Sequence, residues 1–190
     1  MTSHNRRISY TKQSLQTALI DLMQTERFDD ITVKQLCVTA NVNRSTFYAH
    51  YHNLLEVITD VEQQVRTYLM DSLITVQGED GLSFYESSVL EEFLLYIKDN
   101  LKIFKVLLGD ESFFYFTTDI TECVINGLQP KHSFYTTMYF VCGFFGLIRY
   151  WVMAGLPDKI ADISKQLSKI YLSKVHSAEI ASDIQKTDII

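Results

Sequence analysis

Residues 39–53 read "TANVNRSTFYAHYHN" and gather side chains that can donate hydrogen bonds to phosphates and base edges. These are Arg44, Ser45, Thr46, Tyr48, His50 and His52. The whole chain has a net charge of −6, and an acidic protein is not an obvious partner for DNA. The first 60 residues hold six Lys or Arg and six Asp or Glu, so the excess of acid lies entirely in the rest of the chain. The stretch therefore sits in a neutral segment, and the acidic remainder can face away from DNA.

The composition favours long helices in one domain or two small ones. Of the 190 residues, 47% are hydrophobic, and only two are Pro and seven are Gly. Cys37, Cys123 and Cys142 are odd in number and lack C-x-x-C spacing, which indicates neither a disulfide framework nor a zinc site. Each cysteine is most simply a small buried residue in a reducing cytosol. A redox-sensing cysteine stays open as an alternative.

One apolar segment, "FYTTMYFVCGFFGLIRYWVMA" at 134–154, is long enough to cross a bilayer. Thr136 and Thr137 dilute its start, however, and Arg149 lies near its end. The residues after it alternate apolar and charged side chains at helical spacing. We therefore expect a buried helix beside a surface helix and no membrane partner. Residues 1–20 lack the apolar core of a signal peptide, so a cytoplasmic location is expected.

The N-terminal part predicts two helices joined to a third by a tight turn. Over 9–23 one helical face is apolar, made of Leu15, Ala18, Leu19, Leu22 and Met23. Thr32 and Gln35 form a capping-box pattern that starts the second helix. The inward face of that helix is Val33, Leu36, Cys37 and Ala40. Asn41 tolerates the left-handed conformation that ends a helix.

The third helix begins after Asn43, which is expected to cap it through the N–H of Ser45 or Thr46. Phe47 and Tyr51 are spaced to face the second helix. The side chains left pointing outward are Arg44, Ser45 and Tyr48. Two helices joined in this way form a helix-turn-helix, whose second helix presents its first residues to the major groove. A plain helical hairpin with a polar face stays open as the alternative.

Residues 8–58 resemble the DNA-binding domain of the TetR/AcrR family of transcriptional regulators. The match runs through "FDDITVKQLCVTANVNRSTFYAHYHNLLEVI" at 28–58, above all its Thr-Val, Ala-Asn-Val, Ser-Thr-Phe-Tyr and His-Tyr groups. Family members usually have glycine where Asn41 stands, and asparagine can serve the same backbone role.

The resemblance implies that these side chains contact a double-stranded DNA operator. Those that resemble phosphate-contacting residues are Thr32, Thr46, Tyr48 and His50. Those that resemble groove-reading residues are Asn43, Arg44 and Ser45. Arg44 also has the donor fork that suits guanine. The family often places lysine where this chain has Leu54, so one phosphate contact is lost, and His52 or Asn53 is the candidate to replace it in part.

Further helices are expected to the C-terminal side. Asn53 and Glu56 form a cap-and-acid pair that begins a long fourth helix, and "SFYE" at 83–86 is a capping box for the next. Helical segments then follow at 101–108, 112–127, 132–154 and from about Pro157, in the first turn, to 175. The predicted fold class is all-α. The predicted domains are a three-helix bundle with a helix-turn-helix over 1–53, a helical ligand-binding and dimerisation domain over 54–176, and a polar tail over 177–190.

Aromatic residues are concentrated in the C-terminal part, with seventeen of the 24 lying between Phe84 and Trp151. They either pack a helical core or line a ligand cavity with a few polar tips, and the sequence leaves both interpretations open. The family resemblance implies a site for an unidentified small-molecule ligand in this part. The candidate ligand-binding residues are Phe93, Tyr96, Phe104, Phe114 and Tyr139.

The segment "FVCGFFGLIRYWVMAGLP" at 140–157 resembles the C-terminal type of TetR-like regulators found near dihydroxyacetone kinase operons. Residues 134–154 are apolar almost all round, more than one small domain can bury. We therefore expect the last two helices to form a four-helix bundle across the two-fold axis of a homodimer. The candidate interface residues are Gly143, Gly146, Leu147, Ile148 and Trp151.

Catalytic signatures are missing from the sequence, which contains no G-x-G-x-x-G, P-loop or G-x-S-x-G motif. The acidic pairs Glu91-Glu92 and Asp110-Glu111 consist of adjacent residues, which face different directions on a helix. We expect no enzyme, no metal site and no cofactor. The predicted function is a homodimeric repressor that a small molecule releases from its operator. The alternatives are a protein-binding coactivator with the same fold and a cysteine-based redox sensor.

Overall fold

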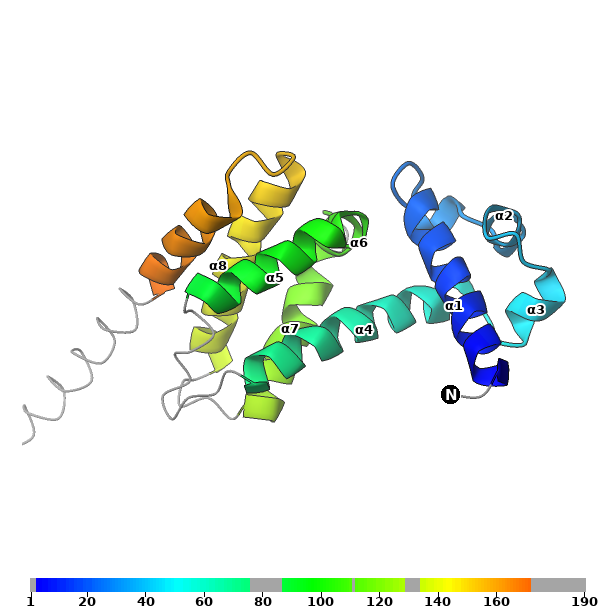
Figure 1. The fold of residues 1–190 in the computed structure, drawn as a ribbon, viewed down its shortest axis with the longest axis horizontal. Coiled ribbons are helices and arrows are strands. Elements are labelled where there is room, and N and C mark those ends of the chain that lie inside the picture. Colours follow the sequence, from blue (N-terminus) through cyan, green and yellow to red (C-terminus); the bar gives the residue numbers. More distant parts are fainter. Residues whose placement is uncertain (1–2, 76–86, 111, 129–133, 172–190) are drawn as a thin grey trace, which may run out of the picture.

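The computed structural model describes residues 3–75, 87–110, 112–128 and 134–171, and within these ranges it contains helices and no strand (Figure 1). The N-terminal elements are α1 (Ser3–Leu22), the 3-10 turn η1 (Phe28–Asp30), α2 (Val33–Thr39) and α3 (Arg44–Tyr48). They are followed by α4 (Leu54–Thr75), α5 (Ser87–Asp99), α6 (Leu101–Leu107), α7 (Phe113–Leu128), α8 (Phe134–Met153) and a last helix over 160–171. The all-α prediction is confirmed. The capping box at 83–86 and the tail at 177–190 lie outside the described residues.

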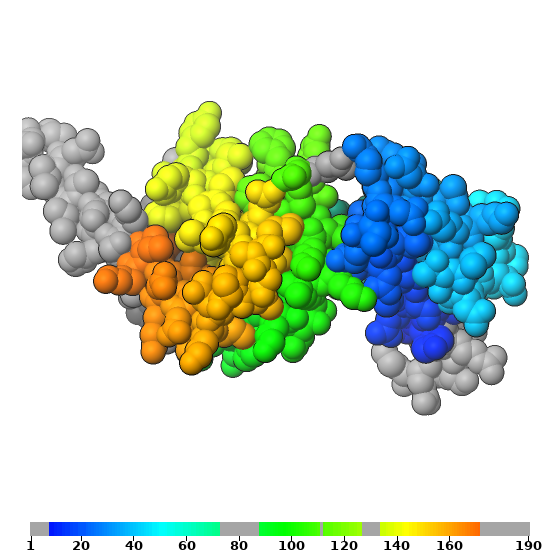
Figure 2. All heavy atoms as spheres, turned by 90° about the horizontal axis from the view of Figure 1, so that it is seen from above, coloured from blue at the N-terminus to red at the C-terminus, as the bar shows by residue number. Residues whose placement is uncertain are grey.

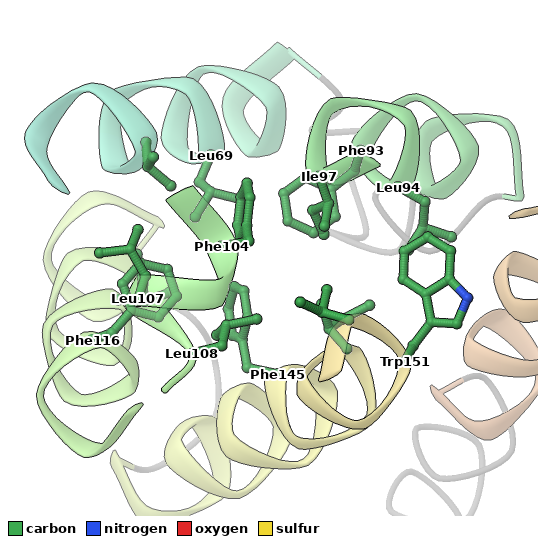
Figure 3. Packing of buried hydrophobic residues seen from close by; sticks show 14 of the residues in the cluster. Leu69, Phe93, Leu94, Ile97, Phe104, Leu107, Leu108, Phe116, Phe145 and Trp151 are labelled. Atoms are coloured by element: carbon green, nitrogen blue, oxygen red, sulfur yellow. The ribbon is translucent and has the colours of Figure 1, made fainter. Parts of the chain in front are cut away.

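Two separate apolar cores hold these helices together. The N-terminal core joins α1, α2, α3 and the first half of α4 around Leu19, Leu36 and Phe47, which are fully buried. The C-terminal core gathers α4, α5, α6, α7, α8 and the last helix around rings such as Phe104 and Trp151 (Figure 3). The chain therefore forms two units, and Figure 2 shows the N-terminal one at one end of an elongated molecule.

Helices α4 and α6 each belong to both cores. Along α4, Val57 and Val61 lie in the N-terminal core, whereas Val65 and Leu69 lie in the C-terminal core. The short helix α6 adds Val106 to the N-terminal core, while its neighbours Leu107 and Phe104 lie in the other. Polar contacts reinforce the link that α6 makes between the two cores. Lys102 Nζ pairs with Asp21 of α1 at 2.6 Å, and the Gln24 side-chain amide donates to the Lys102 carbonyl at 3.1 Å.

Arg149 has a structural role near the end of the apolar helix α8. Its Nε donates to the Leu108 carbonyl at 2.7 Å, at the C-terminal end of α6, and its guanidinium pairs with Asp110. The same group lies 5.5 Å from the centre of the Phe113 ring. This arginine thus fastens α8 to the corner between α6 and α7. In the described part of the chain, no helix is both long and apolar enough for a membrane span.

The end of α8 differs from the sequence prediction in one respect. Gly155, with φ 81°, ends the helix as expected, and the amide of Leu156 then donates to the Trp151 carbonyl at 2.9 Å. Pro157, however, is not in the first turn of the next helix, which starts at residue 160. Leu156 also has a positive φ of 60°. Two successive left-handed residues, Gly155 and Leu156, therefore turn the chain before the next helix begins.

Asn41 ends α2 in the left-handed conformation that the sequence predicts, with φ 53°. Its amide donates to the Val38 carbonyl at 3.1 Å, and the amide of Val42 donates to the Cys37 carbonyl at 2.9 Å. This is the bonding pattern of a Schellman motif, which satisfies two of the carbonyls that a helix end leaves open. The turn between α2 and α3 therefore depends on a residue that accepts a positive φ.

We expect the Asn41→Ala variant to be less stable than the wild type by about 1 kcal/mol, because alanine lacks the short polar side chain that makes the left-handed conformation accessible to asparagine. The Asn41→Gly variant is the matched control and should be within a few tenths of a kcal/mol of the wild type, or roughly neutral. Urea unfolding followed by circular dichroism measures both. Equal destabilisation of the two variants would contradict the assignment of a purely backbone role to Asn41.

Candidate nucleic-acid interface

Helix α3 is anchored by one ring and presents its other side chains to solvent. Phe47 is fully buried in the N-terminal core, with its ring edge-to-face against Tyr48 at 5.2 Å between centres. Arg44 and Ser45 are exposed, and Tyr48 is 51% exposed. The outward direction predicted for these three side chains is confirmed. Arg44 supplies the one cationic side chain of this five-residue helix.

The caps of α2 and α3 only partly follow the sequence prediction. Thr32 Oγ1 accepts a hydrogen bond from the Gln35 backbone N–H at 3.2 Å, as expected. The Gln35 side chain, however, donates to the Glu26 carboxylate at 2.7 and 2.8 Å instead of returning to Thr32. Asn43 occupies the cap position of α3 with an extended backbone, yet its side chain makes no capping hydrogen bond. The predicted hydrogen bond from the N–H of Ser45 or Thr46 to the Asn43 side chain is therefore wrong. The Asn43 carboxamide is exposed and does not cap the helix.

Tyr51 lies beyond the end of α3, which corrects its predicted place within that helix, although its ring is buried in the same core as Leu36 and Cys37 of α2. Its ring is 2% exposed, and its hydroxyl donates to Asp60 of α4 at 2.8 Å. The same hydroxyl accepts from the Gln16 amide of α1 at 3.1 Å. Burial, followed by the hydrogen bond to Asp60 and its charge, strongly raises the pKa of the Tyr51 hydroxyl. Tyr51 thus stays a neutral donor that ties the loop after α3 to two other helices.

The start of α4 holds His52 in place through a cap. The Glu56 amide donates to Asn53 Oδ1 at 3.0 Å, which confirms the predicted cap-and-acid pair. The Glu56 carboxylate accepts from the His52 amide at 2.8 Å and lies 3.1 Å from the His52 ring nitrogen Nδ1. The hydrogen bond from the His52 backbone, followed by the one from its ring, lowers the pKa of Glu56. His52 is exposed, whereas His50 is half-buried.

The eight predicted DNA-contacting residues come from three neighbouring places. Thr32 precedes α2, and Thr46, which is half-buried, belongs to α3 with the residues already described. His50 and His52 lie in the turn between α3 and α4. The arrangement brings an arginine, hydroxyls, an amide and imidazoles to the surface around one short helix, a set of groups that can hold phosphates and reach base edges.

The five predicted ligand-binding residues do not gather at one place. Phe93 and Phe104 lie fully inside the C-terminal core, edge-to-face at 6.4 Å between ring centres (Figure 3). Tyr96 joins them from the side, since its ring is 5.9 Å from Phe104 and stacks on Tyr68 of α4 at 3.6 Å. Burial, followed by the neighbouring Tyr68, raises the pKa of Tyr96. By contrast, Phe114 on α7 and Tyr139 on α8 are exposed.

The five predicted interface residues on α8 divide between its two faces. Ile148 and Trp151 are buried in the core of the protomer, and the Trp151 indole donates to the Asp158 carbonyl at 3.1 Å. Leu147 is 43% exposed, and a β-carbon built at Gly143 or Gly146 would meet nothing within 4 Å. Large apolar side chains of α8 are exposed as well, namely Phe134, Tyr135, Tyr139, Leu147, Tyr150 and Met153.

The cysteines give little support to a redox mechanism. Cys37 is buried in the N-terminal core, and burial raises the pKa of its thiol although the charge of Arg44 acts in the other direction. A raised pKa keeps the thiol protonated and poorly reactive. Cys123 and Cys142 are half-buried on α7 and α8.

Sequence reasoning missed the polar contacts between α1 and α4. Lys12 Nζ donates to Asp60 at 2.8 Å, and the Gln64 amide donates to Gln16 Oε1 at 3.2 Å. Burial acts to raise the pKa of Asp60, but the hydrogen bonds from Lys12 and Tyr51 outweigh it, so that the pKa is lowered. The available signal was a four-residue spacing of polar residues in each helix, with Lys12 and Gln16 in one and Asp60 and Gln64 in the other.

Comparison with known proteins matches the C-terminal part of the chain to a regulator family. The family model TetR_C_8, described as the transcriptional regulator C-terminal region, matches residues 87–173. A curated relative, the uncharacterised HTH-type transcriptional regulator YxbF of Bacillus subtilis (strain 168), is 27% identical over 100 residues. That alignment covers 52% of this chain and 26% of the relative, so the chain spans about a quarter of the length of the relative.

Two solved structures share the fold over most of the chain. A TetR transcriptional regulator from Streptococcus agalactiae 2603V has a TM-score of 0.63 and 20% sequence identity, over 88% of this chain and 96% of that structure. The dihydroxyacetone kinase operon activator DhaS has a TM-score of 0.55 and 19% identity, over 87% of this chain and 96% of that one. These likenesses extend over the helix-turn-helix part and the C-terminal helices alike.

Proposed function

We propose that this chain, which belongs to the TetR family of transcriptional regulators, binds double-stranded operator DNA as a homodimer and is released from it by a small-molecule ligand. The observation that carries the DNA-binding part is the exposure of Arg44 on a helix that Phe47 anchors in the core. Arginine can donate two hydrogen bonds to the outer edge of guanine, and its rigid support fixes the direction of approach. The neighbouring Asn43 carboxamide is not used as a cap and stays available to a base or a phosphate.

The proposal is tested by selecting bound sequences from a random DNA pool with the purified protein. We expect an inverted repeat whose half-sites lie about one helical turn or a multiple of it apart. The Arg44→Ala variant should bind the selected DNA more weakly by about 1–3 kcal/mol and lose specificity at one position of each half-site.

Lys98→Ala, an exposed change on α5, is the control and should leave binding unchanged. If Arg44→Ala weakens binding to selected and random DNA equally, Arg44 holds a phosphate and reads no base. If the wild type enriches no sequence at all, the proposed function itself is wrong.

The homodimer is proposed from the outer face of α8. Tyr135, Tyr139, Gly143 and Leu147 recur every four residues, so these exposed positions form one stripe along the helix. The last helix lies beside α8, where the Phe140 and Tyr171 rings approach to 5.2 Å between centres. A contiguous exposed apolar surface of this kind is typical of a protein interface. The smallest residue, Gly143, leaves room for a partner helix to approach closely.

We expect Leu147→Glu to dissociate the dimer and to weaken operator binding at the same time, because a carboxylate on this stripe would be buried without a partner. Leu95→Glu on α5 is the matched control, since Leu95 is 47% exposed and Leu147 is 43% exposed. Light scattering at micromolar concentration gives the mass of each variant. A wild-type mass of a single 22.0 kDa chain under these conditions would refute the dimer.

The ligand site is proposed in the C-terminal core, between α4 and residues 93–145. The stacked rings of Tyr68 and Tyr96 lie where α4 meets α5, and they place hydroxyls beside a core that is otherwise lined by rings. Such a combination suits an apolar to amphipathic molecule. A ligand bound here would touch α4, which continues into the N-terminal core, and could favour a tilt of α4 that separates the two recognition helices.

A thermal-shift screen of aromatic, lipid-like and sugar-derived compounds tests the ligand site. A compound present at 100 times its dissociation constant should stabilise the fold by about 2.7 kcal/mol. We expect Tyr96→Phe to weaken this response, whereas Tyr10→Phe, an exposed change on α1, should leave it intact. Fluorescence of the buried Trp151 provides an independent signal. If no compound in the screen shifts the transition, the ligand proposal fails while the DNA proposal stands.

A protein-binding coactivator is the second candidate function, and one observation favours it. Phe114 and Tyr115 are 62% and 72% exposed at the start of α7, on a different helix from the α8 stripe. Aromatic side chains are enriched where proteins bind one another. This candidate requires that the protein act without sequence-specific DNA contacts, so enrichment of a defined sequence from the random pool decides against it.

A further inference from the structure

Helices α1 and α4 are joined by two polar pairs that face each other across their crossing. Lys12 of α1 pairs with Asp60 of α4 at 2.8 Å. One helical turn further along, Gln16 accepts from the Gln64 amide at 3.2 Å. Both pairs are spaced by four residues in each helix, so they form two successive rungs between the same helix faces.

Tyr51 occupies the centre of this arrangement, although it belongs to neither helix. Its hydroxyl bridges the two rungs, because it donates to Asp60 and accepts from Gln16. Lys12 Nζ also lies 4.9 Å from the centre of the Tyr51 ring. The ring is buried next to Phe47, the anchor of α3, with 6.1 Å between ring centres. A single hydroxyl therefore connects the loop after α3 to α1 and α4 together.

Hydrogen bonds restrict this crossing more sharply than the surrounding apolar contacts do. Side chains such as Val57 and Val61 gain nearly the same burial after a small slide or rotation of α4. The Tyr51 hydroxyl and its partners, in contrast, have favourable geometry in one arrangement, and Tyr51 and Gln16 are too well buried for water to replace the lost bonds freely.

We propose that Tyr51, Asp60, Lys12, Gln16 and Gln64 are positioning residues that set the orientation of α3 relative to α4 and thereby the affinity for DNA. This inference rests on the proposed function and adds the part of the molecule that fixes the recognition helix. None of the five is among the predicted DNA-contacting residues. Helix α4 continues from Asp60 into the C-terminal core. A change in the tilt of α4 therefore either moves α3 through these hydrogen bonds or breaks the hydrogen bonds.

The Tyr51→Phe variant tests the inference because it removes the hydroxyl and keeps the ring. The probe is the DNA that the wild type selects from a random pool, with random DNA of equal length as reference. We expect affinity for the selected DNA to fall about fivefold or more, since the variant loses both hydrogen bonds of the hydroxyl and a single one is worth about that factor. The ratio of selected to random affinity should fall as well, while the salt dependence of binding stays the same because no phosphate contact is removed. Tyr115→Phe, an exposed change on α7, is the matched control.

A second variant and a double-mutant cycle separate positioning from stability. Gln64→Met removes the outer rung from an exposed position, so it tests the inference even if Tyr51→Phe does not fold. Tyr51→Phe and Asp60→Asn should be non-additive in DNA affinity, since they act on one hydrogen bond. Binding is measured below the thermal transition, with the folded fraction checked by circular dichroism. Folded variants that bind selected DNA like the wild type overturn the inference, whereas a wild type that selects no DNA overturns the proposed function instead.

Discussion

Helix α4 buries a single apolar stripe in two different cores, and this constraint connects the two units of the molecule. Val57 and Val61 complete the N-terminal core, and the same stripe continues through Val65 and Leu69 into the C-terminal core. A regular helix of this length behaves as a stiff rod unless something breaks its ladder of hydrogen bonds. The units therefore cannot reorient independently without repacking one end of α4. The short helix α6, fastened by Lys102 at one end and by Arg149 at the other, adds a second constraint of the same kind.

Features that depend on a few consecutive residues could be predicted from the sequence. The positive φ of Asn41 and the cap formed by Thr32 involve partners no more than a few positions away. The same holds for the buried face of α1, with Leu15, Ala18 and Leu19, because a helical period of apolar residues needs no knowledge of the partner helix. For this reason the order of the helices and the helix-turn-helix could be predicted. The DNA contacts implied by the family resemblance also rest on short motifs, those within residues 28–58.

Features that depend on distant partners were not predictable. Spacing alone placed Tyr51 within the third helix, but α3 ends at Tyr48, and the Tyr51 hydroxyl is bonded to Gln16, which lies 35 residues earlier in the chain. In α8, apolar residues occupy nearly the whole circumference, so the sequence could not separate the inner face, with Ile148 and Trp151, from the outer face with Leu147. The prediction of a capping hydrogen bond to the Asn43 side chain was wrong because a residue can occupy the cap position through its backbone without using its side chain.

The charge is distributed unevenly along the long axis of the molecule. The N-terminal unit, which holds the neutral first 60 residues, lies at one end of an elongated body (Figure 2), whereas the later residues that the structure describes, 61–75, 87–110, 112–128 and 134–171, hold eight Lys or Arg and ten Asp or Glu. In the field of a polyanion such a molecule experiences a torque that turns its acidic body outward before any contact forms. The torque acts over about one Debye length, near 8 Å at physiological salt, and weakens as salt is added. For the DNA binding proposed here, this torque would favour arrival with α3 in front, so that fewer collisions are lost to wrong orientations even without a net positive charge.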